Sequence, residues 1–273
     1  MLIAQLTDLH IRPVGMAADR VSETNMLTDR AFRAVMALDP RPDVVLITGD
    51  LTECGRADEY AVFKKLVAHH MRVPVFFIPG NHDRRDVLIE QVPETRHNEG
   101  FVQFAVDDFP VRFVMLDTVV PGAGHGELCT RRLDWLDRTL SERPDRPTLI
   151  GMHHPPFTTG IAHMDRIDLQ NRSAFHEILA RHRQVSLILC GHVHRPIIAT
   201  VGSALVCCGP SVAHQVELNL HPEGPSQFRL EPPAYLLHRF SRESGFVTHM
   251  AYVESFPGPF PFLTEPDYPG KPS

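Results

Sequence analysis

Seven short apolar runs, separated by segments of helical length, constrain the fold of this 273-residue chain more than any other feature. The apolar runs predict strands over residues 2–7, 44–48, 73–78, 111–117, 148–152, 185–190 and 204–208. The amphipathic segments predict helices over residues 24–38, 57–70, 130–141 and 171–183, the last with Asn171 in the cap position. Alternating strands and helices are typical of an α/β protein, in which helices cover the sheet.

Two pairs of apolar runs depart from this alternation because only a short turn separates them. Residues 101–106 and 111–117 flank the sequence "DDFP", which predicts an antiparallel hairpin and therefore a mixed sheet. A second hairpin is predicted over residues 234–240 and 246–253. The proline-rich tail "FPGPFPFLTEPDYPGKPS" follows it, and this tail could cap a site, contact another subunit or be disordered. Its three phenylalanines favour order over disorder.

The composition excludes several classes of protein. With 43% hydrophobic and 22% charged residues the chain is globular, and a net charge of −6 favours neither nucleic acid nor an anionic membrane as a partner. No apolar run approaches the roughly 20 residues that span a bilayer, and "MLIAQL" is too short for an export signal. Five cysteines without a CxxC pair fit a reducing compartment. We therefore expect a cytoplasmic protein.

Five of the predicted strands end in side chains that can bind metals. These endings are "TDLH" with Asp8 and His10, "TGDL" with Asp50, "GNHD" with Asn81, "MHHPP" with His153 and His154, and "GHVH" with His192 and His194. In open α/β sheets, binding sites form at the carboxyl ends of the strands. Each ending alone has an ordinary explanation as a turn, but five in succession indicate one site.

The number of candidate ligands indicates two metal ions. Without His154 there are seven candidate Asp, Asn and His side chains. These are too many for one ion, which takes four to six ligands and must keep a position open for catalysis. Two ions fit if one carboxylate is shared. Asp50 is the natural bridge, because it follows an early strand between the other groups and has two oxygens.

The series "DLH", "GDL", "GNHD", "MHHPP" and "GHVH" resembles the calcineurin-like metallophosphoesterase superfamily in residue type and order. The segments "TGDLTECGRADEY", "HHPPFTTGIAHMDRIDLQN" and "SVAHQV" are similar to its bacterial branch of class III cyclic-nucleotide and glycerophosphodiester phosphodiesterases. The resemblance implies a four-layer αββα sandwich with mixed sheets. It also implies a catalytic domain over residues 1–210, completed by a C-terminal cap or oligomerisation hairpin and tail over residues 211–273.

The same resemblance implies a ligand set for each metal. One ion would be held by Asp8, His10, Asp50 and His194, and the other by Asp50, Asn81, His153 and His192. Mixed nitrogen and oxygen ligands without cysteine suit Fe, Mn, Zn or Co.

Four further residues receive roles from the resemblance. His82 would be catalytic and face the phosphate, where it stabilises the transition state or protonates the leaving oxygen. Asp83, also expected in the catalytic group, would orient either that histidine or the turn. His214 would lie near the substrate together with Asn81 and His82, although a core or gating histidine is equally consistent. His154 is expected to pack behind the ligands.

The implied activity is hydrolysis of small phosphodiesters, by attack of a metal-activated hydroxide on phosphorus. A phosphomonoesterase or nuclease with the same ligands is the alternative, but a nuclease would favour a basic groove that the sequence does not indicate. A scaffold protein without metal would lack some ligands, whereas all seven are present here. The tail and the segment "FTTGIAHMD" are expected to wall the site. They could also make the contacts of a homo-oligomer, a dimer or higher.

Overall fold

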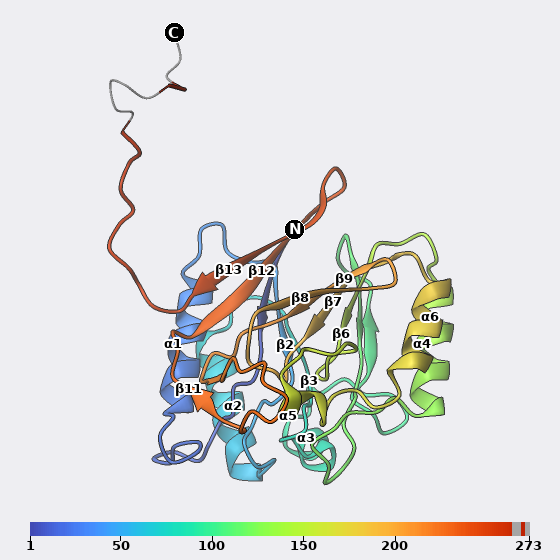
Figure 1. Ribbon diagram of the computed structural model, residues 1–273, viewed down its shortest axis with the longest axis horizontal. Coiled ribbons are helices and arrows are strands. Elements are labelled where there is room, and N and C mark those ends of the chain that lie inside the picture. Colours follow the sequence, from blue (N-terminus) through green and yellow to red (C-terminus); the bar gives the residue numbers. More distant parts are fainter. Residues whose placement is uncertain (264–268, 271–273) are drawn as a thin grey trace.

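The computed structural model describes residues 1–263 and 269–270. Two mixed β-sheets pack face to face between two layers of helices, as Figure 1 shows from left to right. Helices α1 (Thr24–Met36) and α2 (Ala57–His70) cover one sheet, and α4 (Thr130–Ser141) and α6 (Arg172–Arg181) cover the other. The expected four-layer α/β sandwich is therefore confirmed.

The first sheet has the strand order β13-β12-β1-β2-β3. Its members are β1 (Leu2–Leu6), β2 (Val44–Thr48), β3 (Val75–Ile78), β12 (Ala234–Ser241) and β13 (Gly245–Tyr252). Strands β1, β2 and β3 are parallel, whereas β12 pairs antiparallel with β1. The predicted C-terminal hairpin is thus part of this sheet, and an oligomer contact through it stays a prediction.

The second sheet has the order β4-β5-β6-β7-β9-β8. Its members are β4 (Phe104–Val106), β5 (Arg112–Met115), β6 (Thr148–Gly151), β7 (Val185–Cys190), β8 (Ile197–Val201) and β9 (Ala204–Cys208). The edge strands β4 and β8 are antiparallel to their neighbours, and the four inner strands are parallel. The predicted hairpin over residues 101–117 is β4–β5.

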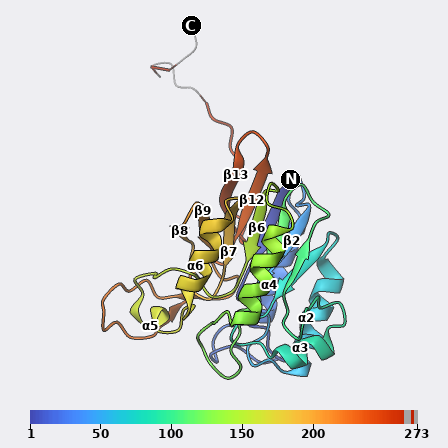
Figure 2. The ribbon, with the colours of Figure 1, turned by 90° about the vertical axis from the view of Figure 1, so that its right-hand side faces the viewer.

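Burial on both faces explains why the strand sequences are continuous apolar runs. Every residue of β2, "VVLIT", is buried, because one face meets the second sheet and the other meets the helices. Helix α1 buries Thr28, Ala31, Phe32 and Val35, which recur at the spacing of one helical face. Figure 2 shows α4 and α6 side by side over the outer face of the second sheet.

Several elements differ from the sequence predictions. Helices α3 (Arg85–Gln91) and α5 (Ala162–Asp165) and strands β8, β10 (Gln215–Val216) and β11 (Phe228–Arg229) were not predicted. Asn171 precedes α6 but does not cap it with its side chain, which instead exchanges hydrogen bonds with the backbone of Leu128. Asn171 therefore holds the predicted cap position without a side-chain cap hydrogen bond, because its side chain ties α6 to the loop before α4.

Residues 256–263 of the proline-rich tail run away from the body of the molecule (Figure 1). In its described part Phe260 and Phe262 are exposed, and no tail residue lines the cavity at the strand ends. The expected wall is therefore absent from the described part of the tail, and residues 264–268 and 271–273 lie outside the described residues. Among the helices of the described chain, none combines the length and apolar character needed to cross a bilayer.

Candidate metal centre

All seven predicted ligands come together where strands of both sheets end. Asp8 and His10 follow β1, Asp50 follows β2 and Asn81 follows β3. His153 follows β6, and His192 and His194 follow β7. The carboxyl ends of five parallel strands, three from one sheet and two from the other, therefore deliver the ligands to a common edge.

The backbone at these strand ends is strained. Five of the ligand residues have positive φ angles, between 47° and 70°: Asp8, His10, Asp50, His192 and His194. Residues other than glycine adopt this conformation rarely and at a cost, and such residues gather at functional sites. This backbone conformation bends the chain sharply where each strand ends.

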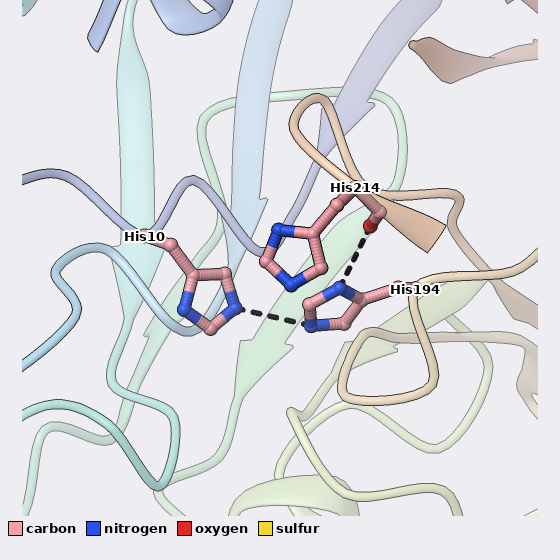
Figure 3. A group of neighbouring side chains, drawn as sticks. All are labelled: His10, His194 and His214. Carbon is pink, nitrogen blue, oxygen red and sulfur yellow. Dashed lines mark hydrogen bonds between the residues drawn. The ribbon is translucent and has the colours of Figure 1, made fainter. Parts of the chain in front are cut away.

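The first ligand group contains Asp8, His10, Asp50 and His194, whose candidate ligand atoms all lie within 4.8 Å of one another. The Nε2 atoms of His10 and His194 are 3.0 Å apart (Figure 3). Nε2 of His194 is 3.4 Å from Oδ1 of Asp8, and Nε2 of His10 is 3.6 Å from Oδ2 of Asp50. Four candidate ligand atoms are therefore close enough to bind one ion.

The opposite nitrogen of each of these rings is already engaged. Nδ1 of His10 donates to the Glu53 carboxylate at 2.6 Å, and Nδ1 of His194 donates to the His214 carbonyl at 2.9 Å. Each Nε2 then carries a lone pair, so the two rings face each other acceptor to acceptor. A cation between them would turn this repulsion into coordination, which is the arrangement of a metal site.

The second ligand group contains Asp50, Asn81, His153 and His192. Oδ1 of Asn81 lies 3.1 Å from Nε2 of His153 and 2.9 Å from Nδ1 of His192. Nδ1 of His153 donates to the Thr48 carbonyl at 2.8 Å, so its Nε2 is the ring nitrogen that faces the amide oxygen. A cation bound at this group would take the place of a proton on Nε2.

Asp50 lies between the two groups. Its Oδ2 is 3.6 Å from Nε2 of His10 and 3.4 Å from Nε2 of His153, one member of each group. Its Oδ1 instead accepts the backbone N–H of His82 at 2.9 Å. The geometry thus fits the bridging position expected for Asp50, but one oxygen faces both groups while the other holds the adjacent turn.

The electrostatics of the site also fit cations. Asp8 and Asp50 are buried, and among the described residues neither pairs with Lys or Arg. Oδ2 of Asp8 has no hydrogen-bond partner, and burial raises the pKa of Asp8 to about 7. Burial would lower the pKa of His153, but Asp50 and Asp8 outweigh it and raise that pKa to about 9. Buried carboxylates without a Lys or Arg partner are costly, and bound metal ions would supply the missing charge.

His82 borders the ligand groups and reaches the cavity in front of them. Its Nδ1 donates to the Glu53 carbonyl at 2.8 Å, so its Nε2 is the nitrogen free to meet a ligand. Burial would lower the pKa of His82, but the Asp50 and Glu53 carboxylates outweigh it and raise that pKa. The ring can therefore present a proton to the cavity, as its expected role requires.

Asp83 turns away from the cavity. Its carboxylate accepts the backbone N–H groups of Gly80, Leu51 and Thr52 at 2.9–3.1 Å, and the Tyr60 hydroxyl at 3.0 Å. Burial raises the pKa of Asp83 to about 6. Of the two roles expected of Asp83, the geometry supports ordering of the turn, since its hydrogen bonds go to the turn and not to the His82 ring.

The two remaining candidate histidines are also near the ligands. Nε2 of His154 donates to the Gly124 carbonyl at 3.1 Å, and its Nδ1 is hydrogen-bonded to the Thr118 hydroxyl at 2.7 Å. With both ring nitrogens engaged, His154 packs behind the site as expected. The His214 ring stacks against the rings of His194 and Phe228, with centroids 4.7 and 5.0 Å apart. His214 lines the cavity, which agrees with a place near the substrate.

Two cavities meet at the site. One, of about 390 Å³, is lined by five of the seven candidate ligands, all except Asp8 and His153. His82, His214 and Phe228 also line it, as do Met164 in the "FTTGIAHMD" segment and Ile167 just beyond it. The other, of about 840 Å³, lies beside α3. Glu53, Asn81 and His82 line both cavities and form the wall between them.

Sequence reasoning missed two residues of the site. Glu53 contacts His10 and His82, and Asp19 lies 3.8 Å from His214. Glu53 stands three positions after Asp50 in "GDLTE", so its closeness to a ligand was the one available signal. Asp19 is part of an irregular segment, from which no pattern could have placed it.

Known proteins match the chain over most of its length. The family model of the calcineurin-like phosphoesterases matches residues 1–196. A protein of Arcobacter nitrofigilis named probable glycerophosphodiester phosphodiesterase GpdQ is 35% identical over 268 residues, 97% of this chain and 98% of that protein. The 3′,5′-cyclic adenosine monophosphate phosphodiesterase CpdA of Pseudomonas aeruginosa is 30% identical over 258 residues, 93% of this chain and 90% of that protein.

A solved structure shares the fold at low sequence identity. A dimetal phosphatase from Danio rerio superimposes with a TM-score of 0.65 at 15% identity, over 93% of this chain and 99% of that one. This match shows the architecture alone. The family model and the two bacterial relatives lead to one conclusion: the chain belongs to the calcineurin-like phosphoesterase family, in the bacterial branch of GpdQ and CpdA.

Proposed function

We infer that the chain is a metal-dependent phosphodiesterase that hydrolyses small phosphodiesters. The observation that carries this inference is the pair of ligand groups that share Asp50 and open, beside His82, into a common cavity. The relatives that match the chain over nearly its full length are named glycerophosphodiester and cyclic-nucleotide phosphodiesterases, and these are the two substrate classes we propose.

The residues of the site have separate roles in the proposed reaction. Two bound cations would supply a water molecule of lowered pKa and a clamp for the phosphate oxygens. The buried carboxylates of Asp8 and Asp50 would offset the charge of these cations, and Asn81 and the histidines would complete the two ligand sets. The water oxygen forms a new bond to phosphorus as the bond to the leaving oxygen breaks.

His82 acts on the phosphate side in this proposal. Its ring is fixed through Nδ1 by the Glu53 carbonyl, and its main chain is fixed by Asp50, so Nε2 meets the substrate with little freedom. From there it stabilises the charge on the phosphate or gives its proton to the leaving oxygen. General acids of this kind contribute about 10²–10⁴-fold to the rate.

The form of the site favours a small diester over a nucleic acid. Two cavities that share the wall of Glu53, Asn81 and His82 offer room for one substituent on each side of a phosphate. Among the described residues that line the smaller cavity none is Lys or Arg. Arg84 and Arg85 line the larger cavity but pair with Asp86 and Asp117, so we assign the main attraction for an anion to the metals. A nuclease would favour a basic groove.

Further properties belong to the same proposal. The mixed ligands suit Fe, Mn, Zn or Co. We propose that the protein works in the cytoplasm as a homo-oligomer, a dimer or higher. We also propose that residues 1–210 carry the catalytic site and that residues 211–273 complete the domain.

The test compares hydrolysis of bis-p-nitrophenyl phosphate with that of p-nitrophenyl phosphate, with added Mn²⁺ and after chelation. We expect metal-dependent hydrolysis that prefers the diester, its loss in His153→Ala, and wild-type rates in His249→Ala, which alters an exposed histidine of β13. Absence of metal-dependent hydrolysis of both compounds would refute the enzyme, and a preference for the monoester would favour the phosphomonoesterase alternative.

A further inference from the structure

Glu53 contacts two functional histidines with two different oxygen atoms. Its carboxylate Oε2 accepts a hydrogen bond from Nδ1 of His10 at 2.6 Å, and its backbone carbonyl accepts one from Nδ1 of His82 at 2.8 Å. The side chain is 17% exposed and lies in the wall between the two cavities. One residue thus links a predicted metal ligand to the histidine that faces the phosphate.

The backbone around Glu53 is held from three directions. The N–H of Glu53 donates to the Ile11 carbonyl at 3.1 Å, which joins the loop after β2 to the loop after β1. The N–H of Thr52 donates to Asp83 at 3.1 Å, and that of Cys54 donates to Glu59 at 3.0 Å. Because both neighbours of Glu53 are fixed to buried carboxylates, its own carboxylate and carbonyl have little freedom to move.

The chemistry of imidazole gives these contacts a consequence. When an acceptor binds the Nδ1 proton, the tautomer is fixed and the Nε2 lone pair is directed at the metal. His153 and His194 are held in this way by the carbonyls of Thr48 and His214. His10 is held by a carboxylate, and a charged acceptor makes the ring a stronger metal ligand than a neutral one.

We propose that Glu53 is a positioning residue of the metal centre. Its carboxylate orients His10 toward the first ligand group, and its carbonyl independently orients His82 toward the phosphate. This inference rests on the metal-dependent function proposed above. The two hydrogen bonds use different atoms, so a side-chain substitution removes the one to His10 and leaves the one to His82. The contribution of the carboxylate to the raised pKa of His82 is lost with the side chain.

Glu53 could instead bind a metal directly, since His10, Glu53 and His82 bring candidate ligand atoms within 4.8 Å of one another. The hydrogen bonds argue against this alternative. Both Nδ1 atoms in this trio already donate to Glu53, while Nε2 of His10 faces His194 and Asp50. The carboxylate therefore lies behind the His10 ring, on the side away from the other ligands of that group.

The experiment measures metal binding separately from activity. Metal-free wild type, Glu53→Ala and Glu53→Gln are titrated with Mn²⁺ by calorimetry, and the thermal midpoint of each metal-free protein is recorded. Glu243→Ala, which alters an exposed glutamate in the β12–β13 turn, is the matched control. We expect Glu53→Ala to weaken one of two binding steps by about 10–100-fold, with the midpoint near that of the control.

Two further readouts separate positioning from a general structural role. Glu53→Gln should regain part of the affinity, because its amide oxygen still accepts the His10 proton. At saturating Mn²⁺ the kcat of Glu53→Ala on bis-p-nitrophenyl phosphate should return to within a few-fold of wild type, since the carbonyl still holds His82.

Four results would overturn the inference. Two binding steps unchanged in Glu53→Ala would show that the carboxylate does not orient a ligand. Weakening of both steps with a lowered midpoint would show that it serves folding. A kcat that stays low at saturating Mn²⁺ would show that Glu53 acts in the chemistry itself. If the wild type binds no metal, the proposed function fails first and this inference with it.

Discussion

Gly80 immediately precedes Asn81, and its missing side chain makes room for the metal ligands. A Cβ atom placed on Gly80 would lie 2.2 Å from Oδ1 of Asp50 and 2.7 Å from Cε1 of His153. Cβ contacts shorter than 3.0 Å essentially do not occur, so Gly80→Ala must move Asp50 or the turn by at least 0.8 Å (3.0 minus 2.2). The carboxylate that would move is the one that faces both ligand groups.

The expected loss follows from that displacement. A misplacement of about 1 Å in a catalytic arrangement can lower the rate by about 10²-fold, which corresponds to about 2.7 kcal/mol in the barrier. We therefore expect Gly80→Ala to lose about two orders of magnitude in kcat/KM on bis-p-nitrophenyl phosphate. Metal per chain, measured by elemental analysis after desalting, should also fall, because Asp50 contributes to both groups.

Gly202→Ala is the control for this substitution. Gly202 lies between β8 and β9 with φ of 60° and no atom within 4 Å of an added Cβ, so alanine there strains the backbone without touching the site. It should lower the thermal midpoint yet keep the metal content and kcat/KM of the wild type. The reasoning would be refuted if Gly80→Ala kept full metal content and its kcat/KM lay within about threefold of this control.

Three other predictions concern single residues. Asn81→Ala should lower turnover mainly by weakening the second metal, so excess Mn²⁺ should restore much of the rate; a loss that metal cannot reverse would contradict this. His82→Ala should lower kcat by about 10²–10⁴-fold at wild-type metal content, and loss of one metal equivalent by elemental analysis would show that its role was wrongly assigned. Burial lowers the pKa of His238 from its ordinary value of 6.5 to about 3. Between these two pH values the histidine is protonated in the unfolded chain and neutral in the folded one, so the unfolding free energy should fall as the pH falls. This histidine lowers the unfolding free energy by about 1.4 kcal/mol for each pH unit. In urea unfolding at pH 6, 5 and 4, the unfolding free energy of His238→Gln should therefore fall less steeply with pH than that of the wild type, by this amount per unit. Equal slopes for the two proteins would exclude this contribution.

The meeting of the candidate ligands at one edge could be predicted from the sequence because two local signals coincide. A buried parallel strand is a continuous apolar run, as in β2, and its end is marked where polar residues such as Asp50 begin. Parallel strands all end at the same edge of a sheet, so the ends meet without any knowledge of the long-range fold. The same reasoning placed Asn81 and His153 correctly at the common edge.

The sequence left open the direction in which a side chain points. Asn171 holds the cap position before a helix as predicted, but its side chain bonds to Leu128 in a distant loop. Asp83 next to His82 was expected to orient either that histidine or the turn, and three backbone N–H groups of two neighbouring turns favour the turn. Glu53 escaped notice because its partner His10 is 43 positions away in the sequence. Such contacts depend on tertiary packing, which no local pattern encodes.

The two sheets reach the ligand cluster from opposite sides, with Asp8, Asp50 and Asn81 on one sheet and His153 and His192 on the other. Any ion held between them joins layers that elsewhere meet mainly through apolar side chains. An ion that binds only the folded chain adds about 2.7 kcal/mol to its stability at 100 times the dissociation constant. With two bound ions, the supply of free metal would therefore govern how firmly the two halves of the sandwich hold together, as well as whether the site can react.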